Sequence, residues 1–152
     1  MKRAVLLLFA ASLFACASGG DGGGGNAQTS GDRPNVQVHV ASTNLTSDLR
    51  FAGPVGIRFA IEIANPSTEV VTLRKIEIHT VASGALTMRS TSLPFNKEIA
   101  PGQTETVEVN GDATSAGGHF ASEEPVSFRG TAYFDSPKGA ISKVFQDVLR
   151  VQ

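Results

Sequence analysis

The strongest constraint on the fold is a strict alternation of apolar and polar positions, clearest at residues 57–64, which are IRFAIEIA. Successive side chains of a β-strand point to opposite faces, so a period of two predicts a strand with one face buried. Similar alternation occurs in VQVHV at residues 36–40 and in VSFRGTAYF at residues 126–134. The predicted inward residues of the first segment are Ile57, Phe59, Ile61 and Ile63. The repeated pattern predicts an all-β domain.

Turn residues and a slip in the alternation divide the remaining chain. Pro66 has no N–H to donate to a sheet and disfavours regular structure at Asn65, so the strand is expected to end there. Between Leu73 and Ile76 the apolar positions shift from odd to even residues, and a β-bulge at residues 74–75 would absorb that shift. A strand is expected to resume over VVTLRKIEIHT, residues 70–80, and another to begin at Leu86 and Met88. Residues 93–109 predict an extended segment, a turn at Pro101-Gly102 and a strand with Val107 and Val109 inward.

With about seven short strands, residues 34–152 are expected to form one immunoglobulin/fibronectin-III-like β-sandwich. The last segment, residues 141–151, leaves an alternative open. Its apolar residues also fit one face of a helix, and Ser136-Pro137 could begin one. A short turn that follows a strong strand favours a hairpin partner, so a strand is predicted here, with a helix as the alternative.

The N-terminus has the features of an export signal. Lys2 and Arg3 are followed by an apolar run at residues 4–15, which is the order of the charged and hydrophobic regions in a signal peptide. A membrane-spanning helix needs about 20 apolar residues, more than this run provides. Residues 1–15 are therefore expected to be a signal peptide that is removed from the mature protein.

Cys16 is the only cysteine of the chain and directly follows this run, so it has no disulfide partner within the sequence. The tetrapeptide Leu13-Phe14-Ala15-Cys16 resembles the lipobox of bacterial lipoproteins. That resemblance implies cleavage before Cys16, lipidation of its thiol and a membrane partner reached through this lipid. Ala17, in place of aspartate, is similar to lipoproteins that are sent to the outer membrane, which implies a position at its periplasmic face. The alternative is ordinary secretion with cleavage near residues 15–17 and an incidental cysteine.

Residues 16–33 are expected to comprise the lipidated cysteine and a flexible, glycine-rich tether. Residues 17–33 contain seven glycines and no large apolar side chain. Such a composition cannot bury enough surface to offset the entropy lost on ordering. Fully extended, this segment would reach about 60 Å. The predicted organisation is therefore a signal peptide, a tether and one β-sandwich.

Composition offers little support for catalysis or for nucleic-acid binding. The chain has 13 Lys and Arg against 14 Asp and Glu, a balance that attracts neither nucleic acid nor an anionic surface. It contains no Trp and a single Tyr, which leaves no aromatic platform for stacking bases or sugars. The Gly-x-Ser-x-Gly motif of serine hydrolases does not occur in the sequence. We therefore expect no enzyme activity, no cofactor and no nucleic-acid partner.

Three histidines are the first candidates for a metal site. His39, His79 and His119 are widely separated in the sequence, whereas zinc ligands usually include close pairs. His39 and His79 also occupy outward positions of predicted strands. All three are expected to be solvated, and no metal site is predicted.

The polar stretch at residues 110–125 is the second candidate, and it is expected to be a solvated loop. Asn110, Asp112 and Thr114 place oxygen atoms at alternate positions, as in a calcium-binding loop. The glycine and the closing glutamate that such a loop requires are missing from their positions. Acid–base work by His119 would need a pocket and a partner at hydrogen-bond distance, neither of which a sequence can show.

Three segments of the predicted domain carry a family resemblance: IRFAIEIANPSTEVVTLRKIEI, LPFNKEIAPGQTETVEV and VSFRGTAYFDSPKGAISKVF. In this order they resemble the late-embryogenesis-abundant type 2 proteins, also called the water stress and hypersensitive response domain, over residues 35–151. The most specific parts are Asn65-Pro66 and Pro101-Gly102, and Ser67 stands where the family usually has Asn or a similar polar residue. The resemblance implies an immunoglobulin-like β-sandwich associated with tolerance of desiccation, without catalytic residues.

These observations predict a non-catalytic, membrane-tethered β-sandwich lipoprotein with a stress-protective or structural role in the cell envelope. Its partners would be the membrane, through the lipid, and protein clients that it shields when water is scarce. The alternative is a binding adaptor, one subunit of an envelope protein complex, which would dock a specific protein through an exposed sheet edge or apolar patch. A large contiguous apolar surface would favour the adaptor.

Overall fold

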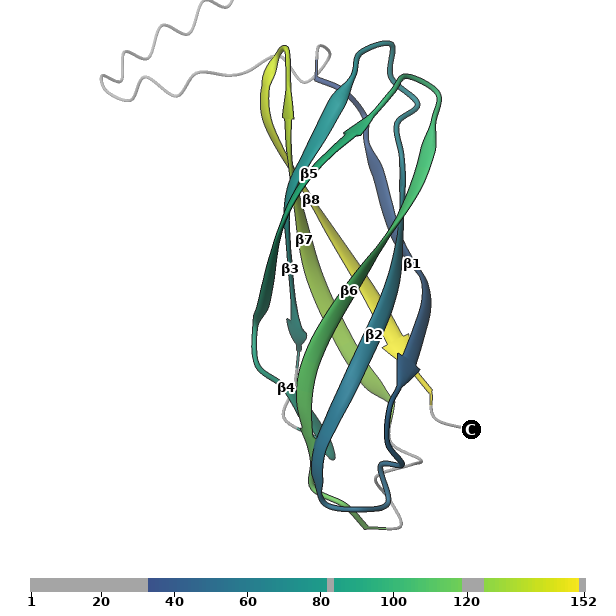
Figure 1. Ribbon diagram of the computed structural model, residues 1–152, viewed down its shortest axis with the longest axis vertical. Coiled ribbons are helices and arrows are strands. Elements are labelled where there is room, and N and C mark those ends of the chain that lie inside the picture. The colour runs from purple at the N-terminus through teal and green to yellow at the C-terminus, as the bar shows by residue number, and fades with distance from the viewer. Residues whose placement is uncertain (1–32, 82–83, 119–124, 151–152) are drawn as a thin grey trace, which may run out of the picture.

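The computed structural model of the protein describes residues 33–81, 84–118 and 125–150. Within these residues the chain forms eight strands in two four-stranded sheets that pack face to face (Figure 1). One sheet has the strand order β1-β2-β6-β4 and the other β5-β3-β7-β8, with antiparallel pairs throughout. The strands are β1 (Gln37–Leu45), β2 (Gly53–Ala64), β3 (Val71–Thr80), β4 (Leu86–Met88), β5 (Thr91–Ile99), β6 (Thr104–Ser115), β7 (Val126–Ser136) and β8 (Gly139–Leu149). The predicted all-β sandwich is confirmed.

The core lies between the two sheets and contains the residues that the alternation predicts to point inward. In β2 these are Ile57, Phe59, Ile61 and Ile63, all of which are buried. Phe59 meets Phe128 of β7 edge to face, with ring centroids 5.1 Å apart, an arrangement that aromatic pairs favour. This contact joins the centres of the two sheets.

The predicted bulge in β3 is present. The register of β3 shifts between Leu73 and Lys75 against both of its neighbours, β5 and β7. The extra residue, Arg74, is exposed and reaches across the sheet: its Nε donates to Asp135 Oδ2 at 2.7 Å, and its Nη1 donates to Asn96 Oδ1. The bulge therefore keeps the apolar residues on both sides of it in the core, and its side chain links β5 to β7.

The strand number differs from the predicted seven because residues 93–99, expected only as an extended segment, belong to β5. This strand pairs with β3 along most of its length. Pro94 within it weakens the sequence signal, but β5 is at the edge of its sheet, where a proline that donates no hydrogen bond is tolerated.

The loop predicted at residues 110–125 begins later than expected, because β6 continues to Ser115. Gly111, Ala113 and Ser115 face inward and are buried, and they are too small or too polar to give an apolar alternation. Small residues are needed here because a Cβ on Gly111 would lie 2.7 Å from Met88 Sδ. The second half of β6 therefore resembles a loop in sequence while it completes a sheet in space.

The C-terminal segment is a strand, and the helical alternative is wrong. β8 pairs with β7 without a break in register over its whole length. Ile141 and Phe145 are buried, whereas Val144 and Val148 are about half exposed. A helix would have placed all four on one face, but a strand turns the two valines outward.

The two ends of the sandwich carry different loops (Figure 1). At the entry end, the described chain begins at Arg33, and the turns between β2 and β3, β5 and β6, and β7 and β8 lie nearby. The far end holds residues 46–52, between β1 and β2, and the C-terminal end of β6. Between the ends, Thr43 Oγ1 donates to Asp147 Oδ2 at 3.0 Å, which joins edge strand β1 to edge strand β8.

Candidate functional site

The entry end is organised by a buried polar side chain, Asn65, which is 1% exposed. Its Nδ2 donates to the carbonyl oxygens of Glu69, at 2.8 Å, and Ile99, at 2.9 Å. Its Oδ1 accepts a hydrogen bond of 2.6 Å from Ser67 Oγ. A buried amide that uses both its donor and its acceptor groups is stabilising, because each unpaired group would cost free energy.

The backbone of Asn65 connects a second turn to the same centre. Its N–H donates to the Gln103 carbonyl at 2.9 Å, and its own carbonyl accepts from Gly102 N–H at 2.7 Å. Gly102 has φ of +72°, a conformation that favours glycine. The Asn-Pro and Pro-Gly pairs, which are 36 positions apart in the sequence, are thus parts of one hydrogen-bonded unit that closes this end of the sandwich.

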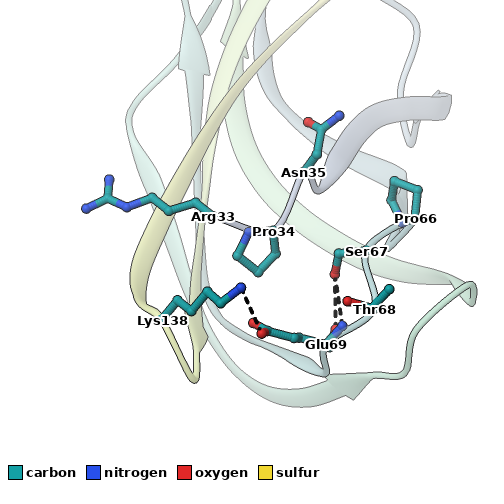
Figure 2. A pocket seen from close by; sticks show the side chains of 8 residues that line it. All are labelled: Arg33, Pro34, Asn35, Pro66, Ser67, Thr68, Glu69 and Lys138. Carbon is teal, nitrogen blue, oxygen red and sulfur yellow. Dashed lines mark hydrogen bonds and ion pairs between the residues drawn. The ribbon is translucent and has the colours of Figure 1, made fainter. Parts of the chain in front are cut away.

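A pocket of about 300 Å³ opens beside this unit (Figure 2). Lys138, from the turn between β7 and β8, reaches over it, and its Nζ lies 3.1 Å from Glu69 Oε1. The other carboxylate oxygen, Glu69 Oε2, is buried and has no hydrogen-bond partner among the described residues. The lining residues are Arg33, Pro34, Asn35, Pro66, Ser67, Thr68, Glu69 and Lys138. This set offers charges of both signs and hydroxyl groups, but it contains no nucleophile–base pair.

A cluster of ionisable groups with shifted pKa values lies on the outer face of β3 and β7. Lys75 Nζ lies 2.7 Å from Glu77 Oε1 and 4.4 Å from the centre of the Tyr133 ring, and Tyr133 Oη donates to Glu77 Oε2 at 2.9 Å. Hydrogen bonds from Lys75 and then Tyr133 hold the pKa of Glu77 below its ordinary value, while bonding to Glu77 raises the pKa values of Lys75 and Tyr133. These shifts move away from neutrality, whereas an acid–base catalyst needs a pKa near the working pH. The cluster is a surface contact between strands.

The histidines are not brought together by the fold. His39 is exposed on β1, with Nε2 3.4 Å from Glu62 Oε1, and His79 is exposed on β3 in the other sheet. His119 lies outside the described residues. Across residues 33–81, 84–118 and 125–150, no three His, Cys, Asp or Glu side chains are close enough to hold a metal ion.

The residues that suggested a calcium loop lie on a strand. Asn110, Asp112 and Thr114 are outward and exposed at alternate positions of β6. An extended strand sets such side chains in a row about 6.5 Å apart, so they cannot converge on one ion.

The predicted lipid attachment site, Cys16, lies outside the described residues, as do the predicted signal peptide and almost all of the tether. Within the described part of the chain, no helix is long and apolar enough to cross a membrane.

Comparison with known proteins shows a likeness in fold and none in sequence families. No family model matches the chain, and no curated protein matches its sequence. A crystal structure described as ApaA from Bordetella pertussis is 14% identical, covers 78% of this chain and 94% of its own, and has a TM-score of 0.52. A structural genomics target is 12% identical over 76% of this chain and 85% of its own, with a TM-score of 0.49. A late-embryogenesis-abundant protein solved in solution is 13% identical over 78% of this chain and 73% of its own, with a TM-score of 0.42.

At such identities the likeness is one of architecture. The ApaA structure shares the β-sandwich arrangement over most of both chains. The fold places the described domain in the class of β-sandwiches, and this class serves many unrelated functions. Function is therefore argued from the chain's own surfaces.

Proposed function

We propose that the protein is a non-catalytic lipoprotein whose β-sandwich is held at the periplasmic face of a bacterial outer membrane by a lipid on Cys16, where it protects envelope proteins under stress. The observation that carries the proposal is the polar character of the outer face of β6. All six outward side chains of β6, in the middle of its sheet, are exposed and bear oxygen: Thr104, Thr106, Glu108, Asn110, Asp112 and Thr114. Such a face retains water and resists self-association.

The large exposed apolar side chains do not gather into one patch. Among the described residues they are Phe51, Val70, Val81, Val144 and Val148. Phe51 is at the far end and Val70 at the entry end. Val81 N–H donates to the Ser127 carbonyl of β7, so Ser127 stands between Val81 and Val148, and Gln146 separates Val148 from Val144. Single exposed apolar residues are ordinary on soluble domains. This distribution supports weak contact with many clients over docking of one partner.

The resemblance to the water stress family supports the same role. Its two most specific parts, Asn65-Pro66 and Pro101-Gly102, meet at the entry end, where Asn65 is the hydrogen-bonded centre. In this fold these two parts therefore link the turn between β2 and β3 to the turn between β5 and β6 by hydrogen bonds.

A drying assay tests the protective role. The mature chain with Cys16→Ser, mixed at equal molar amount with a labile enzyme, is expected to preserve more of its activity through drying or freeze–thaw than an equal mass of an unrelated stable protein. The matched control is Thr106→Leu with Asn110→Leu, two outward changes that leave the core intact and place two apolar side chains on the β6 face. We expect this control to protect less well. Protection by the parent no better than by the unrelated protein would contradict the role.

One observation favours the alternative, a binding adaptor in an envelope complex. β8 is the last strand of its sheet and exposes Val144 and Val148 on its outer face, and exposed apolar side chains can mark a site for a specific partner. A photocrosslinker at Val144 in cells distinguishes the two roles. A single recurrent adduct would support the adaptor, and many weak adducts would support the protective role.

A further inference from the structure

The loop at the far end, residues 46–52, is held more firmly than a simple connection requires. Leu49, at its centre, is 1% exposed and is part of the hydrophobic core. The Leu49 carbonyl accepts a hydrogen bond of 2.7 Å from the buried Ser115 Oγ. At the start of the loop, Thr46 N–H donates to the Gly56 carbonyl and Thr46 Oγ1 accepts from Gly56 N–H, both at 2.9 Å. The loop is thus fixed at its first residue and at its middle.

The other side of this loop is packed against the end of β6. The Arg50 carbonyl accepts from Gly118 N–H at 3.0 Å. Gly117 has φ of +72°, and a Cβ there would lie 2.6 Å from the backbone nitrogen of Ala52, so the two backbones touch. Within the loop, Arg50 Nε donates to Asp48 Oδ2 at 2.8 Å, which pairs its two charges.

This firmly held loop presents Phe51 to solvent. Phe51 is 72% exposed, the highest value among the large apolar residues that the structure describes. An aromatic side chain on a preorganised loop loses little conformational entropy when it is buried by a partner. Within residues 46–52 the only charged side chains are Asp48 and Arg50, which pair with each other, so this loop offers a preorganised apolar contact.

The small free-energy gain from burying one aromatic side chain limits which kind of partner Phe51 can bind. Burying one phenylalanine raises an association constant by about ten- to a hundredfold, which falls short of what even a millimolar complex between free molecules needs. It is sufficient only for a surface already held nearby, where the effective concentration is high. The bilayer at the predicted lipid anchor is such a surface. The predicted tether would span about 60 Å when fully extended, which exceeds the roughly 40 Å length of a twelve-residue strand, so the far end of a chain anchored at Cys16 is within reach of that bilayer.

We propose that Phe51 inserts into the bilayer to which the protein is tethered, so that the domain lies on the membrane with its far end in contact with lipid. This inference rests on the proposed lipid tether. Because the loop pairs its own charges, the contact is apolar and does not depend on anionic lipid.

The chain has no tryptophan, so Phe51→Trp introduces a single fluorescent reporter at a solvent-exposed position. The mature chain, with a histidine tag in place of lipidated Cys16, is attached to phosphatidylcholine vesicles that contain a nickel-chelating lipid. Tethering is expected to shift the emission of the introduced indole to the blue and to allow quenching by brominated acyl chains. The matched control is Val144→Trp, on the outer face of β8, where neither change is expected.

Indole emission that stays as in buffer after tethering would overturn the proposal, and so would equal quenching at the two positions. The artificial tether separates this test from the proposed function. A negative result here leaves lipidation at Cys16 and client protection untouched, while failure of lipidation in cells leaves the vesicle result standing.

Discussion

Asn65→Asp is expected to remove a large part of the folding free energy at neutral pH. The substitution keeps the shape of the side chain but takes away the N–H donors that serve the carbonyls of Glu69 and Ile99. Each buried acceptor left without a partner costs about 1–3 kcal/mol, so about 2–6 kcal/mol is lost from a total that is typically about 5–15 kcal/mol. Urea unfolding at pH 7 measures the loss.

The same variant should recover stability in acid. Burial raises the pKa of a carboxyl above its unfolded value, and a group whose folded pKa is raised contributes most below its unfolded pKa and least above its folded pKa. The deficit is therefore expected to shrink as the pH falls from 7 towards 4, where the protonated carboxyl can donate one hydrogen bond. The control is Ser67→Ala, which removes one partner of Asn65 Oδ1 and should cost about 1 kcal/mol. Equal costs for the two variants would contradict a central role of Asn65.

Gly130→Ala is expected to destabilise the domain by about 1–3 kcal/mol, the usual cost of forcing extra volume into a packed core. Gly130 is directly opposite Phe145 in the pairing of β7 with β8. A Cβ at Gly130 would lie 2.1 Å from Phe145 Cζ and 2.6 Å from Cε2, so the ring has to shift from its present position. Thermal and urea unfolding of the variant measure this cost.

A double-mutant cycle identifies the cause. In a Phe145→Ala background the ring is gone, so Gly130→Ala should cost little. The two single changes are thus expected to be strongly non-additive. Additive effects would show that strain other than the Phe145 contact explains the loss.

The sequence predicts much of this fold because alternate side chains of a strand point to opposite faces, so that burial of one face leaves a period of two in the sequence. Inward positions of β2 have large apolar side chains, those of β7 alternate with polar outward residues, and the phase slip in β3 required the bulge that is found at Arg74. The second half of β6 escaped prediction because its inward residues, such as Gly111 and Ala113, are small where Met88 crosses them. The small size of these residues is required by packing against Met88 of β4, a contact that the local sequence pattern does not contain.

The entry and far ends were less predictable. Pro66 marked the end of a strand, but the partners of Asn65 include Ile99 and Gln103, which only the folded topology brings close. Phe51 gave no signal, since a single aromatic in a short connecting segment suits a core as well as a surface. Its exposure follows from Leu49, which occupies the core position of that loop.

The mass of the N-terminal peptide of the mature protein, isolated from the membranes of a diderm host, tests the proposed tether most directly. We predict a peptide that begins at Cys16 and carries the mass of attached acyl chains, together with a Cys16→Ser variant that moves to the soluble fraction. An unmodified N-terminus near Ala17, with both forms equally soluble, would contradict a lipid-tethered protein.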